Sequence, residues 1–206
     1  MHSIHLTGDA LWSRMERAVE KVQERLRRAV AVLESLGVPY AVVGGHDVRV
    51  WVAQIDEAAV RNTKDVDILI RRDDLKQLKP AMANAGFVYR EAAGLAMFLD
   101  GPDGSPCEAV NLVFAGEQVK DAEPQPNPTL DHAASVADFK TLDLDTLVRM
   151  KLNSYRLKDR VHLVDMLDVG LIDASWAERL PGELGERLRQ LIENPDAGAQ
   201  ESEHEA

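Results

Sequence analysis

The sequence predicts one compact domain of the α+β class, in which a small, twisted, partly antiparallel sheet is wrapped by helices. Two observations support this. A strand, a glycine turn, a short helix and a second strand follow one another at residues 40–71, which begins a mixed sheet. Helical periodicity before this stretch, at residues 9–36, and after it, at residues 144–170, supplies helices to cover the sheet. A chain of 206 residues is long enough to bury one such core.

The first predicted element is a long amphipathic helix at residues 9–36. Its apolar side chains recur at steps of three and four residues, and Gly37 followed by Pro39 ends it. The stripe consists of Leu11, Met15, Ala18, Val19, Val22, Leu26, Ala29, Val30 and Leu33. The basic residues of this helix would suit RNA, but they alternate with glutamates, which favours a solvent-exposed face of mixed charge. We expect the stripe to pack on the core.

A glycine turn follows the first strand. Residues 40–43 form an apolar run of strand length, and Gly44 and Gly45 then lead into a short helix at residues 46–54. Without Cβ atoms, the backbone N–H groups of such a turn can approach an anion closely, and the helix N-terminus adds favourable partial charge. The turn is therefore a candidate phosphate site.

Two carboxylates lie on the predicted strand at residues 63–70. Because side chains alternate along a strand, Asp65 and Asp67 point to one face, about 6.6 Å apart, while the aliphatic residues point to the other. A divalent cation would remove the repulsion between them, since Mg²⁺ binds one or two carboxylates together with substrate phosphates. Taken separately, the acidic pattern also fits an edge strand and the glycines an ordinary turn. Together they predict a magnesium site at Asp65 and Asp67.

The remaining elements complete the domain. We expect a helix at residues 73–85, short strands at residues 87–90, 95–99 and 108–114, a proline-rich surface loop at residues 115–130, and helices at residues 144–170 and 176–192. The chain then divides into an N-terminal helix packed on the core (1–37), the sheet core (38–115), a loop with C-terminal helices of the same domain (116–195), and a disordered acidic tail (196–206).

Composition restricts the partners. The formal net charge of −11 repels nucleic acid phosphates, so general DNA binding is not expected. No apolar run approaches the ~20 residues of a membrane helix, and residues 1–5 lack the features of a signal peptide. The single cysteine, Cys107, suits a reducing compartment. We expect a cytoplasmic protein that does not bind membranes.

Gly44-Gly45, followed by Arg61-x-Thr63-Lys64-Asp65-Val66-Asp67-Ile68, resembles the signature of the polymerase-β-type nucleotidyltransferase superfamily. The resemblance is strongest to the bacterial group of AbiEii-type toxins and minimal nucleotidyltransferases, and it covers about residues 38–170. It implies the nucleotidyltransferase fold, with the site between the sheet and the C-terminal helices. It also implies that Arg61, Thr63 and Lys64 lie near the nucleotide. Serine is common in the family at the position of Gly45.

A second stretch, at residues 150–165, resembles a helical motif of the AbiEii-type group. The resemblance implies that Lys151, Arg156 and Lys158 bind the phosphates of the nucleotide, with Asp159 and Asp165 as orienting partners. Lysine binds phosphate as a point charge and arginine binds it through two hydrogen bonds, so the assignment is physically sound. With Asp65 and Asp67, Lys151 is the third expected catalytic residue.

One position departs from the family pattern. Such enzymes usually carry a third carboxylate on a later strand, and Asn111 stands where that acid is expected. Asparagine is a weaker metal ligand and cannot act as a base, whereas Glu108 is predicted to face the other side of its strand. The implied function is Mg²⁺-dependent transfer of a nucleoside monophosphate from an NTP to an acceptor hydroxyl on tRNA, a small molecule or a protein. Two Mg²⁺ ions are possible. The alternative is a nucleotide-binding or toxin–antitoxin module with weakened catalysis.

Overall fold

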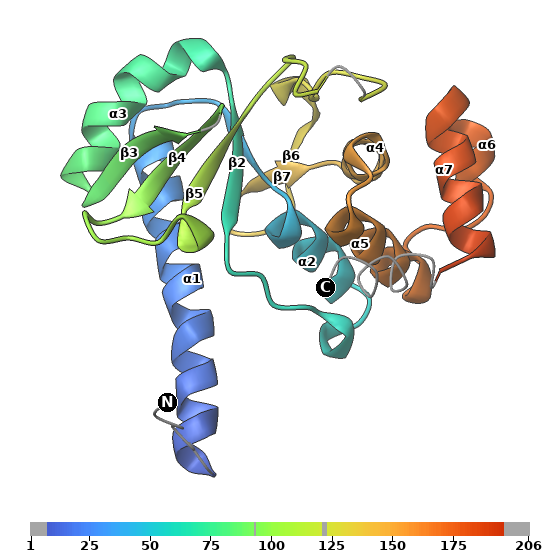
Figure 1. The fold of residues 1–206 in the computed structure, drawn as a ribbon, viewed down its shortest axis with the longest axis horizontal. Helices are drawn as coiled ribbons and strands as arrows, with labels where there is room; N and C mark the ends of the chain where they lie inside the picture. The colour runs from blue at the N-terminus through green and yellow to red at the C-terminus, as the bar shows by residue number, and fades with distance from the viewer. Residues whose placement is uncertain (1–7, 93, 121–122, 196–206) are drawn as a thin grey trace.

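The computed structural model describes residues 8–92, 94–120 and 123–195 and has the predicted α+β architecture (Figure 1). Its main sheet has five strands in the order β1-β2-β5-β4-β3. The strands are β1 (Tyr40–Val43), β2 (Val66–Ile70), β3 (Phe87–Ala92), β4 (Leu95–Asp100) and β5 (Val110–Phe114). Strands β2 and β5 are parallel, whereas the other neighbours are antiparallel. The sheet is therefore mixed, as the sequence predicted.

Helices cover both faces of this sheet. On one face, α1 (Asp9–Ser35) and α3 (Leu75–Asn84) pack against side chains such as Val42, Ile68 and Phe98. On the other face, Val43 and Leu69 pack against α2 and the C-terminal helices. These helices are α2 (Gly45–Ala53), α4 (Leu144–Ser154), α5 (Leu157–Asp168), α6 (Trp176–Arg179) and α7 (Gly182–Glu193). Because side chains alternate along β2, Asp67 points to the same face as Leu69, which is the face that the C-terminal helices cover.

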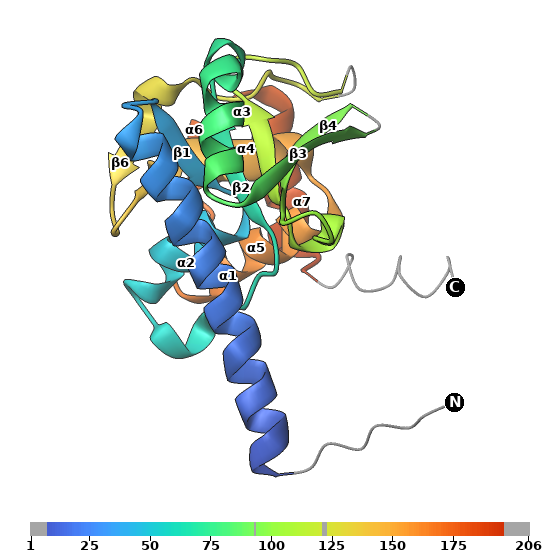
Figure 2. The same ribbon diagram turned by 90° about the vertical axis from the view of Figure 1, so that its left-hand side faces the viewer.

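Helix α1 is as long as predicted, but only its second half packs on the core. Buried apolar side chains begin at Val22 and end at Leu33. The first half projects from the body of the protein (Figures 1 and 2), and Leu11, Trp12 and Met15 are exposed. The stripe therefore packs on the core over its second half, from Val22 to Leu33. The helix is longer than the sheet beneath it, so the periodic pattern continues where no core remains.

The C-terminal region contains two details that the sequence did not indicate. The helical stretch at residues 144–170 is two helices, separated at Tyr155, which has a left-handed backbone with φ of 44°. A small hairpin, β6 (Ala133–Ser135) and β7 (Lys140–Leu142), precedes α4, and β7 contacts β1.

Short 3-10 turns lie at Glu57–Ala59, Arg72–Asp74, Pro106–Glu108 and Leu130–His132. The predicted acidic tail at residues 196–206 lies outside the described residues. Over the part of the chain that is described, no helix is both long and apolar enough to cross a membrane.

Candidate functional site

The two carboxylates lie at the start of β2. Asp65 immediately precedes the strand, and its Oδ1 accepts a hydrogen bond of 2.9 Å from the Thr63 hydroxyl. Asp67 lies within the strand, directly beside Asn111 on the parallel strand β5. The Asn111 amide donates a hydrogen bond of 3.0 Å to Asp67 Oδ1. Asn111 therefore lies beside Asp67, and its amide contacts this carboxylate directly.

The electrostatic environments of the two carboxylates differ. Burial raises the pKa of Asp67, and the negative charge of Asp65 raises it further. Burial also acts to raise the pKa of Asp65, but the Lys158 ammonium, 3.7 Å from Asp65 Oδ2, and the Thr63 hydroxyl together hold it below its usual value. Without a cation the two carboxylates therefore repel each other, and this repulsion raises the pKa of the more buried Asp67.

The glycine turn lies directly against these carboxylates. Gly44 is the N-cap of α2 with φ of 76°, and a Cβ atom on it would lie 2.2 Å from Asp67 Oδ2. A Cβ atom on Gly45 would lie 2.9 Å from the Thr63 hydroxyl oxygen. Gly44 therefore requires glycine for reasons of space and of backbone conformation, whereas a side chain at position 45 would displace Thr63. In this chain the Thr63 hydroxyl occupies the space into which a serine at position 45 would extend.

The basic residues of the second motif lie around one buried carboxylate. Asp159 Oδ1 is 3.2 Å from Lys151 Nζ, and its Oδ2 accepts hydrogen bonds of 2.8 Å from Arg156 Nε and from the Ser154 hydroxyl. Although burial opposes ionisation, the charges of Lys151 and Arg156 lower the pKa of Asp159 to about 2. Lys151 is only 3% exposed, whereas Arg156 and Lys158 are exposed. Asp159 thus contacts both Lys151 and Arg156, as a residue that orients these two side chains would.

Two cavities adjoin the glycine turn. The larger is a cleft of about 870 Å³ between the sheet, α4 and the loop residues 117–120 and 123–129. Its lining includes Gly44, Asp67, Asn111, Lys151, Arg156 and Lys158. The loop is fixed on α4, because Asn153 exchanges two hydrogen bonds with the backbone of Gln125. The predicted surface loop thus forms a wall of the cleft.

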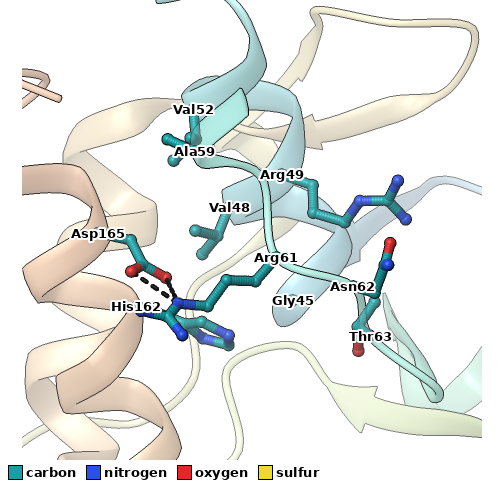
Figure 3. A pocket seen from close by; sticks show the side chains of 10 residues that line it. All are labelled: Gly45, Val48, Arg49, Val52, Ala59, Arg61, Asn62, Thr63, His162 and Asp165. Carbon is teal, nitrogen blue, oxygen red and sulfur yellow. Dashed lines mark hydrogen bonds and ion pairs between the residues drawn. The ribbon is translucent and has the colours of Figure 1, made fainter. Parts of the chain in front are cut away.

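The smaller cavity, of about 20 Å³, lies on the other side of the turn (Figure 3). Gly45 and Thr63 line it together with His162, and Figure 3 shows Arg61 reaching across to Asp165 on α5. Arg61 Nε lies 2.8 and 2.7 Å from the two Asp165 oxygens, so the observed partner of Asp165 is Arg61 and not one of the basic residues of the second motif. A cavity of this volume holds about one water molecule.

The structure separates the predicted site residues into two groups. Gly44, Asp67, Lys151, Arg156 and Lys158 line the large cleft. The other residues do not line the large cleft. Asp65 adjoins it through its contact with Lys158. The small cavity is lined by Gly45, Thr63 and Arg61, and Lys64 is exposed on the surface.

Sequence reasoning missed His162 and left His46 without a role. His162 Nδ1 and His46 Nε2 are buried and have no hydrogen-bond partner among the described residues. Burial, together with the positive charge of Lys151 near His162 and of Arg49 near His46, lowers the pKa of each imidazole to about 4. Both are therefore neutral at physiological pH. A histidine in a helix gives no sequence signal that distinguishes such a position from an exposed one.

The donor set fits a hard divalent cation that retains open positions. Within the described residues, no group of three or more His, Cys, Asp and Glu side chains could hold a metal ion. The oxygen donors at this position are instead two carboxylates, beside the Asn111 amide and a large open cleft. Mg²⁺ is bound in this way, with one or two carboxylates and with substrate phosphates completing the coordination. Asp65 and Asp67 would hold it.

Comparison with known proteins places the fold. No protein-family model and no curated protein matches the sequence. Among solved structures, the solution structure of the antibiotic-resistance factor ANT(2'')-Ia superposes with a TM-score of 0.52 at 11% identity, over 92% of this chain and all of the other. An antigenic nucleotidyltransferase-like protein from Paracoccidioides brasiliensis superposes with a TM-score of 0.51 at 20% identity, over 85% and 90% of the two chains. The chain therefore shares the overall fold of these two proteins.

Proposed function

We propose that the protein is a cytoplasmic, Mg²⁺-dependent nucleotidyltransferase that moves a nucleoside monophosphate from an NTP to an acceptor hydroxyl. One observation carries the proposal. Asp67 Oδ2 lies against Gly44 where a Cβ atom would otherwise be, at the edge of a large cleft, and Lys158, which also lines the cleft, has its ammonium 3.7 Å from Asp65 Oδ2. A pair of carboxylates, a helix N-terminus and exposed cationic side chains together supply the ligands that a metal-bound triphosphate requires.

Each residue has a distinct part in this proposal. Asp65 and Asp67 hold one or two Mg²⁺ ions, and the bound metal neutralises triphosphate charge. The backbone N–H groups at Gly44 and Gly45 donate to phosphate oxygens. Lys158, Arg156 and the exposed Lys64 add positive charge. Thr63 orients Asp65 through its hydroxyl, and Arg61 fixes the loop before β2 to α5.

Lys151 acts through the same cluster. Its ammonium is buried and bonded to Asp159, which in turn holds the more exposed Arg156. We propose that Lys151 contributes positive potential to the cleft and keeps Asp159 ionised, so that Arg156 remains directed at the phosphates. Because an ammonium in a low-dielectric site acts over a longer range than one in water, a lysine that is mostly buried can still stabilise phosphate charge.

The acceptor is proposed to be a small molecule. The cleft of about 870 Å³ lies within the 300–1,000 Å³ typical of small-molecule sites. The net charge of −11 disfavours a tRNA acceptor, although a tRNA end or a protein side chain presents the same hydroxyl chemistry.

Asn111 favours a second candidate function, a nucleotide-binding or toxin–antitoxin module that has lost turnover. Its amide N–H group points at Asp67, and an amide cannot accept a proton from an attacking hydroxyl. Transfer would then be slow or absent, while nucleotide binding through Asp65 and Asp67 would remain.

Two assays on the same protein distinguish these functions. NTP binding is measured by calorimetry with and without Mg²⁺, and pyrophosphate release is measured over a panel of acceptor hydroxyl compounds. The proposed enzyme binds NTP only with Mg²⁺ and releases pyrophosphate with at least one acceptor. Binding without release over the whole panel supports the module instead, and absence of Mg²⁺-dependent binding refutes both.

A further inference from the structure

Arg25 in α1 is a charged residue buried beside the start of β2. Its side chain is only 3% exposed, although α1 lies outside the stretch with family resemblance. The guanidinium has three partners from three parts of the chain. Nε donates to Asp100 Oδ2 at 3.3 Å, Nη1 donates to the Lys64 carbonyl at 3.2 Å, and Nη2 lies 3.7 Å from Glu108 Oε2. A buried charge needs such partners, and their directions fix where the guanidinium lies.

The Lys64 carbonyl is the important partner, because the Lys64–Asp65 peptide bond sets the direction in which Asp65 leaves the backbone. The loop at residues 60–65, which leads into β2, has no regular secondary structure. Several other contacts hold it: the Val66 amide donates to the Ala109 carbonyl at 3.2 Å, the Thr63 hydroxyl donates to the Asp65 carboxylate, Lys158 pairs with Asp65, and Arg61 binds Asp165 on α5. Arg25 connects the loop to α1.

We propose that Arg25 is a positioning residue for Asp65. It holds the Lys64 carbonyl so that the Asp65 carboxylate lies on the same side as Asp67, ready to share a cation. The inference rests on the proposed function of Asp65 as a metal ligand. It adds a residue from the N-terminal helix to a site that otherwise comes from the sheet and the C-terminal helices.

Arg28 offers a matched control on the same helix. It also donates to Asp100, and its guanidinium lies 4.6 Å from the centre of the Phe87 ring. Arg28→Met therefore removes the same charge and one bond to the same carboxylate, but leaves the donor to the Lys64 carbonyl in place. A general loss of packing between α1 and the sheet affects both variants, whereas loss of Asp65 positioning affects only Arg25→Met.

The experiment compares wild type, Arg25→Met, Arg25→Lys and Arg28→Met. Amide hydrogen exchange at residues 63–66 is measured without ligand, together with the melting temperature and the Mg²⁺ concentration for half-maximal NTP binding. Loss of a group that orients a metal ligand typically costs about 10–100-fold in metal affinity. We expect that increase in half-saturating Mg²⁺ for Arg25→Met, with faster exchange at Val66. Arg25→Lys should be intermediate, and Arg28→Met should stay near wild type in both.

Equal exchange and equal Mg²⁺ dependence in Arg25→Met and Arg28→Met would overturn the proposal. If wild type shows no Mg²⁺-dependent NTP binding, the proposed function fails, and ligand-free exchange alone then decides whether Arg25 holds the loop. If Arg25→Met does not fold, Arg25→Lys is compared with Arg28→Lys by the same measurements and the same criterion.

Discussion

Gly44 allows the sharpest test of the contact between the glycine turn and Asp67. In Gly44→Ala the new Cβ would lie 2.2 Å from Asp67 Oδ2, so the carboxylate must move. The backbone at Gly44 also has φ of 76° and ψ of −138°, a conformation that only glycine adopts readily. The substitution therefore combines backbone strain with displacement of a proposed metal ligand.

The two costs are similar in size, so a control variant is needed to separate them. Backbone strain of this kind costs about 1–3 kcal/mol of unfolding free energy. Moving Asp67 away from the Asn111 amide loses a hydrogen bond to a charged group, worth about 1.5–3 kcal/mol. Gly170 provides the control, because it has φ of 74° and a Cβ atom added to it would meet nothing within 4 Å. Gly170→Ala thus reports strain at a positive φ alone.

Both variants are assayed by chemical denaturation and by calorimetric titration with NTP and Mg²⁺. We expect Gly44→Ala to be less stable than Gly170→Ala and to lose Mg²⁺-dependent NTP binding, whereas Gly170→Ala should bind as wild type does. Wild-type NTP affinity in a folded Gly44→Ala protein would refute the view that the glycine turn and Asp67 form one site.

Three further predictions concern the neighbouring residues. Asn111→Asp should lower stability without ligand, tighten Mg²⁺ binding and, with a productive acceptor, speed transfer by about 10²–10⁴-fold; unchanged metal affinity would argue against a role for this position. Lys151→Ala should weaken binding of triphosphate more than that of nucleoside; equal losses would show that Lys151 serves packing alone. Asp159→Asn should cost about 3–5 kcal/mol in urea unfolding at neutral pH, since it leaves buried Lys151 without its partner. Because the Asp159 pKa is lowered from 3.8 to about 2, the difference from wild type should be full above 3.8 and shrink as the pH falls through about 2; a pH-independent difference would contradict the ion pair.

The sequence predicted the parts of the site that depend on local periodicity. The alternation of Asp65 and Asp67 with aliphatic residues placed both acids on one side, and the later strand placed Asn111 beside them. The turn at Gly44 followed from an apolar strand that ends in two glycines. These features depend on backbone rules that act within a few residues, so a single sequence is enough to find them.

Contacts between residues far apart in the chain could not be predicted from the sequence. Nothing local distinguishes Arg25, which is buried against the Lys64 carbonyl, from the exposed arginines on the same helix. The apolar stripe did not reveal that Leu11 and Met15 extend past the core, because helical periodicity is independent of what lies beneath it. The break at Tyr155 was missed for a similar reason, since non-glycine residues rarely adopt a left-handed backbone.

The proposed function depends most directly on the Asp65–Asp67 pair. Calorimetric titration of wild type and Asp67→Asn with NTP, each with and without Mg²⁺, tests it in one experiment, and the ligand-free melting temperature shows whether the variant is folded. Because ionised Asp67 is buried beside Asp65, we expect Asp67→Asn to melt at the same temperature as wild type or higher and to lose Mg²⁺-dependent NTP binding. Equal NTP affinity in the two proteins, with the same dependence on Mg²⁺, would contradict the metal site.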